Sequence, residues 1–483
     1  MTAAIMRSVV GRRRLAVIAS LVGISVASTD ERWGSVPGEA KGTPPGIVDI
    51  ERFGARPNDG IDDTRAIQRA LDRPGTREVL IGRGSYLVSG IDVRRPVRLR
   101  LARSARVVLA KESNRSVVSL VSPRASLVGG VIDGSRAGQS DGRWGGAITV
   151  TADDVEVREV RVANSYGIGI LVRGADRARI TKSAVRQSGN IGIFAEAVGS
   201  VPILGLTVID NVVDRTGEGL DIQEGGIKVH GVHDSPAVVD SVLVKDNIVR
   251  MPGRPRDQSA IAIELWGNVR RGHVAGNSTY GGSMGISLDN TIGRVENNVV
   301  SAPGLIGIEL ASSIRSTVSG NTVMCQGVTS KGIVLANQSP TSNRIAFNTV
   351  SACIDRGIQA NGGSDRLAVI GNTVIGPSSF LVEVIASRSV VVSANELRGN
   401  APSGAGIVID EATQVAIEGN RFCDTGKTGV RIYADADIVL DGIVVEDNVF
   451  HRVERSLSVE LSGGATLGPG LVLGPNERRG WPC

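Results

Sequence analysis

Four consecutive copies of a short repeated segment carry chemically capable side chains at matching positions. The copies read GIKVH, AIELW, GISLD and GIELA. Their third and fifth positions hold Lys228 and His230, then Glu264 and Trp266, then Ser287 and Asp289, and finally Glu309. Paired carboxylates supply the acid, base or nucleophile of glycoside hydrolysis. A lysine or histidine beside them can abstract a proton or hold a substrate carboxylate. We therefore predict that Lys228, His230, Glu264, Asp289 and Glu309 are catalytic.

The spacing of the copies sets the distances between the carboxylates. If the copies are stacked parallel strands, neighbouring copies lie about 4.8 Å apart. Glu264 and Asp289 are then on adjacent strands, whereas Glu264 and Glu309 are about 9–10 Å apart at the backbone. Carboxyl groups lie about 5–5.5 Å apart in retaining glycosidases and about 6.5–9.5 Å apart in inverting ones. Both stereochemical outcomes therefore stay open.

Four residues beside the carboxylates are predicted to bind substrate. Trp266 can stack on a sugar ring, because an exposed tryptophan is unusual without a partner. Glu196 occupies the fifth position of the preceding copy, and Arg270 and Arg271 follow Trp266 in the sequence. These four residues complete the candidate site.

Two alternatives stay open for the charged residues. Lys228 and Glu264 are also the components of a plain cross-strand ion pair. Adjacent carboxylates can bind Ca²⁺, although no cofactor is expected to be required. Neither alternative is decided by the residue types alone.

A second pattern, ending in asparagine, recurs along the last two-thirds of the chain. Successive asparagines are 21 to 36 residues apart, a spacing typical of solenoids. They are Asn211, Asn247, Asn277, Asn298, Asn321, Asn348, Asn372, Asn395, Asn420 and Asn448. We expect them to form a hydrogen-bonded ladder at one bend, because asparagine tolerates left-handed backbone and bonds its neighbours.

The two patterns together predict the fold. Each repeat supplies at least two short strands, and most repeats are too short to include a crossover helix. Side chains alternate across a strand, so the aliphatic positions are expected to point inward and the third and fifth positions to face solvent. The sequence therefore predicts an all-β protein, a single-stranded right-handed parallel β-helix (β-solenoid) of about 12 coils.

The ends of the chain differ from the repeats. Arg12, Arg13 and Arg14 precede a short apolar run, so residues 1–27 are predicted to be a signal peptide, with a hint of twin-arginine export. We assign 28–46 to a flexible linker, 47–125 to the N-terminal cap and first coils, 126–462 to the β-helix and 463–483 to a C-terminal tail. Asp62-Asp63-Thr64 and the apolar residues that follow predict a helix that caps the N-terminal mouth.

The charge balance and the cysteines bear on the partners of the protein and on its disulfide bonds. The chain has 54 Lys and Arg against 49 Asp and Glu, and the predicted signal peptide holds four of the basic residues. The remainder is nearly neutral, which does not indicate an acidic partner. Cys325 and Cys353 occupy nearly the same place in adjacent coils, within disulfide range. We predict that bond, and a Cys423–Cys483 bond that fastens the tail, with pairs of free thiols as the alternative.

The N-terminal region resembles a known superfamily. The segments FGARPNDGIDDTRAIQRALD and GGVIDGSRAGQSDGRWGGAITV are similar to the opening of the pectate-lyase superfamily, the group related to family 28 glycoside hydrolases. The resemblance covers the N-terminal 100 or so residues at the level of motifs and the remainder only as a generic β-helix repeat, and it implies a β-helix and carbohydrate chemistry. The later motifs depart from family 28, because Gly272-His273-Val274 lacks the closing glycine and Ile227-Lys228 precedes it. A polygalacturonase mechanism therefore cannot be carried over.

These observations favour an exported carbohydrate-active enzyme that cleaves a polysaccharide or oligosaccharide, namely a glycoside hydrolase. A polysaccharide lyase acting on a uronate-containing glycan by β-elimination stays open, as does a non-catalytic glycan-binding or surface protein. We expect a secreted or periplasmic protein, monomeric or trimeric, with no nucleic-acid or membrane partner.

Overall fold

The computed structural model describes residues 46–142, 144–216, 225–231, 238–251, 260–326, 329, 331–336, 342–376, 378–399, 402, 404–435, 437–468 and 470–479. The predicted signal peptide, the predicted linker up to residue 45, and Cys483, the predicted partner of Cys423, lie outside the described residues.

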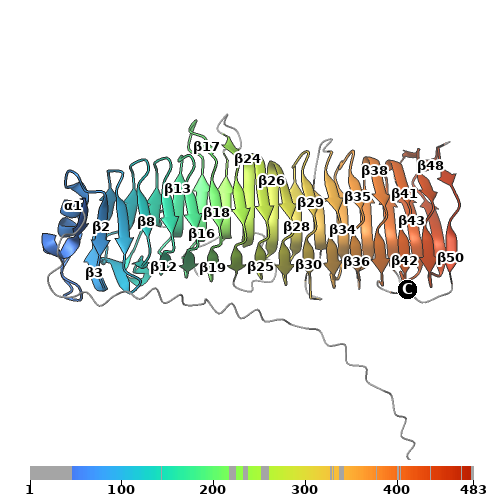
Figure 1. The fold of residues 1–483 in the computed structure, drawn as a ribbon. Helices are drawn as coiled ribbons and strands as arrows, with labels where there is room; N and C mark the ends of the chain where they lie inside the picture. Colours follow the sequence, from blue (N-terminus) through green and yellow to red (C-terminus); the bar gives the residue numbers. More distant parts are fainter. Residues whose placement is uncertain are drawn as a thin grey trace, which may run out of the picture. The chain divides into compact units, whose positions relative to one another are not determined.

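The chain forms a right-handed parallel β-helix, as predicted (Figure 1). Each regular coil contributes one strand to each of three columns, for example β28 (Ile306–Ala311), β29 (Thr317–Ser319) and β30 (Thr322–Met324). All pairings between the named strands are parallel, from one coil to the next. The helix makes about 14 turns. The prediction of about 12 was low because the early coils lack the asparagine pattern.

The first column carries the repeated five-residue segment. Its strands are β10 (Gly146–Val150), β13 (Ile168–Arg173), β16 (Ile191–Glu196), β20 (Gly225–His230), β24 (Ile261–Ala275), β26 (Met284–Glu296), β28, β31 (Lys331–Ala336), β34 (Arg356–Asn361), β37 (Phe380–Ile385), β40 (Ala405–Asp410), β43 (Thr428–Ala434) and β47 (Arg455–Leu461). The second and fourth positions of the segment point into the core, where Ile308 and Leu310 are fully buried. This column positions the candidate site.

Most copies of the segment begin with a small residue, and Gly307 shows why the narrow core favours one. A Cβ atom on Gly307 would lie 2.4 Å from Val323 Cγ1 and 2.5 Å from the carbonyl oxygen of Gly332. Real Cβ atoms do not approach other atoms so closely. Glycine at this position therefore lets the first and third columns approach each other in this coil.

The asparagines form the predicted ladder along the bend between the second and third columns. The backbone N–H and the side-chain Nδ2 of Asn298 both donate to Asn321 Oδ1 at 2.9 Å, and Asn321 makes the same two bonds to Asn348. The pattern continues through Asn448 to Asn476, one coil beyond the copies identified in the sequence. The ladder asparagines from Asn211 to Asn448 are at most 1 % exposed.

We predicted that the ladder asparagine has the left-handed conformation at this bend. In the structure, the residue before the asparagine has it. Asn297, Gly320 and Phe347 have φ values of 56°, 66° and 57° and directly precede ladder asparagines. Placing the turn one residue earlier lets the asparagine side chain point inward, where its amide meets the next coil. This explains why most copies begin with Asp, Asn or Gly, the residues that adopt this conformation most readily.

Replacing Asn321 by Ala is expected to lower the free energy of unfolding by at least about 2 kcal/mol. The change leaves two buried donors of Asn298 and the carbonyl of Val295 without their partner. Chemical denaturation measures the effect. The matched control is Asn361→Ala, at an exposed position, which should change stability by less than about 0.5 kcal/mol. Equal effects of the two substitutions would show that the ladder does not stabilise the coils.

The disulfide between Cys325 and Cys353 forms as predicted, with Cα atoms 4.8 Å apart in adjacent coils. The predicted capping helix is α1 (Thr64–Asp72), which lies at the N-terminal end of the stack (Figure 1). Its Ala66, Ile67, Ala70 and Leu71 join the hydrophobic core. The stack also extends past residue 462, because β49 (Val472–Leu473) and β50 (Glu477–Arg479) pair with the preceding coil.

Candidate functional site

The strand register brings the predicted catalytic residues into two adjacent rows on the outer face of the first column. The third positions align as Lys228, Glu264, Ser287 and Glu309 in successive coils. The fifth positions align as Glu196, His230, Trp266 and Asp289. We call these eight residues the outer-face cluster. The predicted adjacency of the rows is therefore confirmed.

The prediction that the third position faces solvent is wrong. Lys228, Glu264 and Ser287 are 4 %, 8 % and 2 % exposed. The same strands carry a second apolar cluster outside the main core, formed by Ile261, Met284, Ile306 and Val334. Lys228, Glu264 and Ser287 therefore pack among their neighbours, whereas Glu309 and the fifth-position residues are half-buried.

Glu264 accepts contacts from two neighbouring side chains. Its Oε2 lies 3.0 Å from Lys228 Nζ and 2.8 Å from His230 Nε2. Burial opposes ionisation of Glu264, but the hydrogen bond from His230 and the charge of Lys228 outweigh it and lower the pKa to about 2. Glu264 is therefore a fixed anion at neutral pH, and it is unsuited to donate a proton.

A glycine makes room for the lysine in this arrangement. Gly225 stands where the next two coils have Ile261 and Met284. A Cβ atom on Gly225 would lie 2.2 Å from Lys228 Cε. The missing side chain thus leaves space for the aliphatic stem of Lys228, so that its ammonium group can reach Glu264.

Glu309, two coils beyond Glu264, has the opposite electrostatic character. Burial raises its pKa, and the negative charges of Asp289 and Glu264 raise it further, against the opposing effect of a hydrogen bond from Ser287. Ser287 Oγ donates this bond to Glu309 Oε2 at 2.9 Å. Glu309 is therefore the carboxyl of the cluster that is best suited to hold a proton.

Aromatic rings flank the histidine. The ring of His230 lies 4.9 Å from that of Phe194 in an edge-on arrangement and 5.2 Å from that of Trp266 in a tilted one. Trp266 is half-buried, so one part of the indole can meet a ligand. The sequence prediction did not include Phe194, although it occupies the third position one coil before Lys228.

The strands that carry Glu264 and Asp289 are the longest in the described part of the chain. β24 and β26 run without interruption from the first column into the second, over 15 and 13 residues. Their pairing includes two register shifts, near Asn268 and Arg271, which both have positive φ. Bulges of this kind bend a strand while it stays paired. The centre of the cluster is thus set on continuous strands.

The other predicted substrate-binding residues lie around the cluster with partners of their own. Glu196 accepts a hydrogen bond from Arg173 Nε at 2.6 Å. Arg271 binds Asp240 through two bonds of 2.7 Å. Arg270 is exposed on β24 beyond the first register shift. Their roles in substrate binding stay predictions.

A second polar group lies further along the same row and was not predicted. Glu383, which is 3 % exposed, accepts hydrogen bonds from Arg356 Nε at 2.6 Å and Gln359 Nε2 at 2.7 Å. Val334 separates this group from Glu309. The sequence could have indicated this group, because Gln359 and Glu383 are polar residues between Val334 and Val408 in the series of third positions.

Within the described residues, no three His, Cys, Asp or Glu side chains are grouped as metal ligands. A cavity of about 200 Å³ lies several coils before the cluster, between Asn114, Gln139, Asp141 and Tyr166. No helix in the described part of the chain is long and apolar enough to cross a membrane.

Two family models match parts of the chain. A model of the right-handed beta helix region matches residues 326–468, and a model described as periplasmic copper-binding protein (NosD) matches residues 242–381. These matches confirm that the repeats are those of a right-handed β-helix. They do not confirm the predicted relation to family 28. No curated protein matches the chain. In the NosD range, Cys325 and Cys353 are joined in a disulfide and so do not offer thiolate ligands for copper, and His273 is hydrogen-bonded to Glu296.

Solved structures match the chain at low identity. The A-module of a mannuronan C-5 epimerase from Azotobacter vinelandii is 14 % identical, over 87 % of this chain and 99 % of that one, with a TM-score of 0.38. Gene product 12 of bacteriophage phi29 is 12 % identical, over 86 % and 57 %, with a TM-score of 0.48. A Streptococcus pneumoniae surface adhesin is 12 % identical, over 89 % and 91 %, with a TM-score of 0.29. Such values give no support for a shared activity.

Proposed function

We propose that the protein is a glycan-cleaving enzyme, a glycoside hydrolase whose reaction takes place on the outer-face cluster. The observation that carries this proposal is the contrast between Glu264 and Glu309. The two carboxyls lie two coils apart on one face, and their surroundings move their pKa values in opposite directions. Such a contrast is how active sites separate a proton donor from a permanent anion.

The geometry suggests a role for each group. Glu309 protonates the leaving oxygen of the glycosidic bond. Asp289, on the intervening coil, acts as the base for water or as the nucleophile. Glu264 stays ionised and stabilises positive charge that develops on the sugar ring. Trp266 provides a surface on which a sugar can stack.

The arrangement of His230 favours a second candidate, a polysaccharide lyase. A carboxylate that binds one ring nitrogen of a histidine orients the ring and makes the other nitrogen a better base. Glu264 has this relation to His230. In a lyase, His230 would remove the proton next to a uronate carboxylate. Lys228 would keep Glu264 ionised through their ion pair.

A product assay separates these functions. The protein is incubated with a panel of neutral and uronate polysaccharides, and both reducing ends and the ultraviolet absorbance of unsaturated uronates are followed. A hydrolase gives reducing ends without the absorbance, whereas a lyase gives both. Retained binding without either product would assign a non-catalytic role and contradict the proposal.

Substitutions then test the site. Glu264→Gln, Asp289→Asn and Glu309→Gln should each reduce cleavage. Glu383→Gln, a buried glutamate of the same row outside the cluster, is the matched control and should leave cleavage unchanged. Intact cleavage in all three cluster variants would place the site elsewhere. Assays with and without EDTA test the prediction of Ca²⁺ between adjacent carboxylates.

The proposed setting is outside the cytoplasm. The Cys325–Cys353 disulfide supports this, because such bonds persist in oxidising compartments. The match to a family described as periplasmic agrees with it.

A further inference from the structure

The N-terminal cap has a strong positive charge that the near-neutral balance of the whole chain conceals. Residues 46–125 contain 16 Lys and Arg against 9 Asp and Glu, whereas residues 126–483 contain 32 against 37. The net charges are therefore +7 and −5. Segregated charge of this kind attracts a partner of opposite sign to one end of a molecule.

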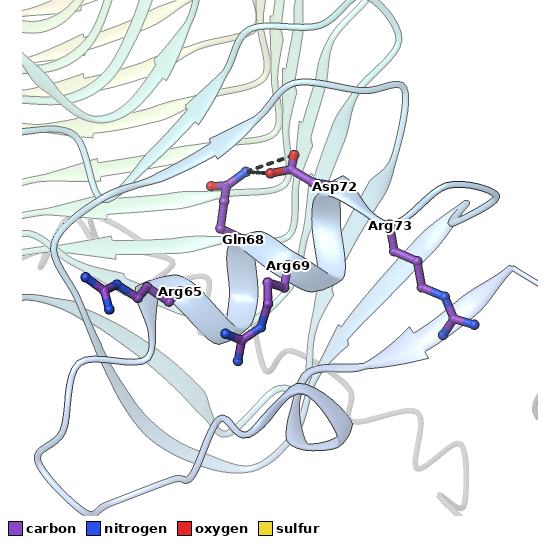
Figure 2. A pocket seen from close by; sticks show the side chains of 5 residues that line it. All are labelled: Arg65, Gln68, Arg69, Asp72 and Arg73. Atoms are coloured by element: carbon purple, nitrogen blue, oxygen red, sulfur yellow. Dashed lines mark hydrogen bonds between the residues drawn. The ribbon is translucent and has the colours of Figure 1, made fainter.

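Three of these basic residues lie on or directly after α1. Arg65 and Arg69 are four residues apart on the helix, about 6 Å along its axis, and Arg73 directly follows its last residue in an extended conformation. All three are exposed and line a hollow of about 460 Å³ with Gln68 and Asp72 (Figure 2). Figure 2 shows Arg65 and Arg69 on the helix and Arg73 beyond its end, with all three side chains directed away from the Gln68–Asp72 pair.

These arginines have few internal partners. Among the described residues no ion pair is recorded for the three guanidinium groups, and Arg69 donates to the carbonyl oxygen of Phe53. The carboxylate of Asp72 accepts two bonds from Gln68, and Arg94 lies 3.9 Å away. Like charges four residues apart destabilise a helix. An external anion would remove this repulsion.

The residues of α1 favour one class of anionic partner over the others. Its apolar residues, including Ile67 and Leu71, are buried in the core, so it has no free apolar face with which to enter a lipid surface. The helix sequence TRAIQRALD has no aromatic residue on which nucleic-acid bases could stack. Three exposed arginines around one hollow suit a linear polymer that carries many carboxylates, because each guanidinium can bind a carboxylate through two bonds.

We infer that Arg65, Arg69 and Arg73 form a docking surface for an acidic polysaccharide, separate from the outer-face cluster. The surface would hold a polyuronate chain at the N-terminal end of the stack. It does not depend on the proposed function, since it would bind the polymer whether or not the protein cleaves it. The near-neutral total did not indicate an acidic partner, because it averages this local charge with the net negative charge of the rest of the chain.

Binding of the full chain to immobilised polygalacturonate tests this inference. We expect binding at low salt that weakens as sodium chloride is raised, and no binding to the fully methyl-esterified polymer, whose backbone is the same but uncharged. The triple variant Arg65→Glu, Arg69→Glu, Arg73→Glu should bind about tenfold more weakly or worse. The variant in which the same three arginines are replaced by Gln should show a smaller loss of binding. It tests the inference even if the Glu variant does not fold.

The matched control changes three exposed arginines outside the cap, Arg179→Glu, Arg366→Glu and Arg421→Glu. It alters the net charge equally and should retain binding. Equal losses in both triples, unchanged binding in both cap variants, or no binding by the unmodified protein would overturn the inference. Tighter binding to duplex DNA or to anionic vesicles than to polygalacturonate would also overturn it. Cleavage of short oligosaccharides by the cap variants reports on the outer-face cluster independently.

Discussion

Replacement of Glu309 by Gln is expected to lower kcat by a factor of about 10²–10⁴ with little change in KM. Glutamine keeps the size of the side chain and can accept the bond from Ser287, but it cannot donate a proton to a leaving oxygen. The raised pKa of Glu309 also predicts that activity falls as pH rises through that pKa, because the acid loses its proton. The variant should lack this basic limb.

Steady-state kinetics over a range of pH measure both effects. Substrates with an activated leaving group need no protonation and should restore much of the rate to Glu309→Gln. A parallel loss of rate with natural and activated substrates would show that Glu309 is not the acid. An intact pH profile in the variant would lead to the same conclusion.

Replacement of Lys228 by Met is expected to destabilise the protein by about 3–5 kcal/mol. The change leaves Glu264 buried with His230 as its remaining recorded partner. Replacement of both members, as in Lys228→Met with Glu264→Leu, should recover most of this loss, because buried ion pairs can often be exchanged for apolar residues at little net cost. Thermal and chemical unfolding of the three variants measure the coupling.

The hydrogen bond from His230 and the charge of Lys228 on Glu264 also make stability dependent on pH. The pKa of Glu264 falls from 4.5 to about 2 on folding, so the folded state is favoured by about 3 kcal/mol wherever the unfolded carboxyl is ionised. This contribution is present above about pH 4.5 and is lost as pH falls toward about 2. Glu264→Gln should show a weaker loss of stability over this range. An identical acid dependence in the variant would show that Glu264 does not carry the effect.

The sequence allowed the fold and the rows of the site to be predicted, because both follow from periodicity. The asparagines gave the register, and the register aligned Lys228 with Glu264 and Glu309. The burial of the third-position side chains could not be predicted from periodicity. Whether Glu264 is exposed depends on how side chains of adjacent coils pack, and the space above Gly225 that admits Lys228 is a property of three dimensions. For the same reason the opposite pKa shifts of Glu264 and Glu309 were not predicted.

The continuous strands β24 and β26 have a consequence for how this surface can change. Elsewhere in the stack a turn separates the first and second columns, and a turn tolerates insertions. Between Trp266 and His273 the two strands stay paired on both sides of two bulges, which already absorb two more residues in β24 than in β26. We therefore expect this face to acquire a new ligand preference through side-chain replacements at the paired positions, which leave the backbone as it is. Libraries that vary Trp266, Arg270 and Asp289 on the fixed backbone are the natural route to altered specificity.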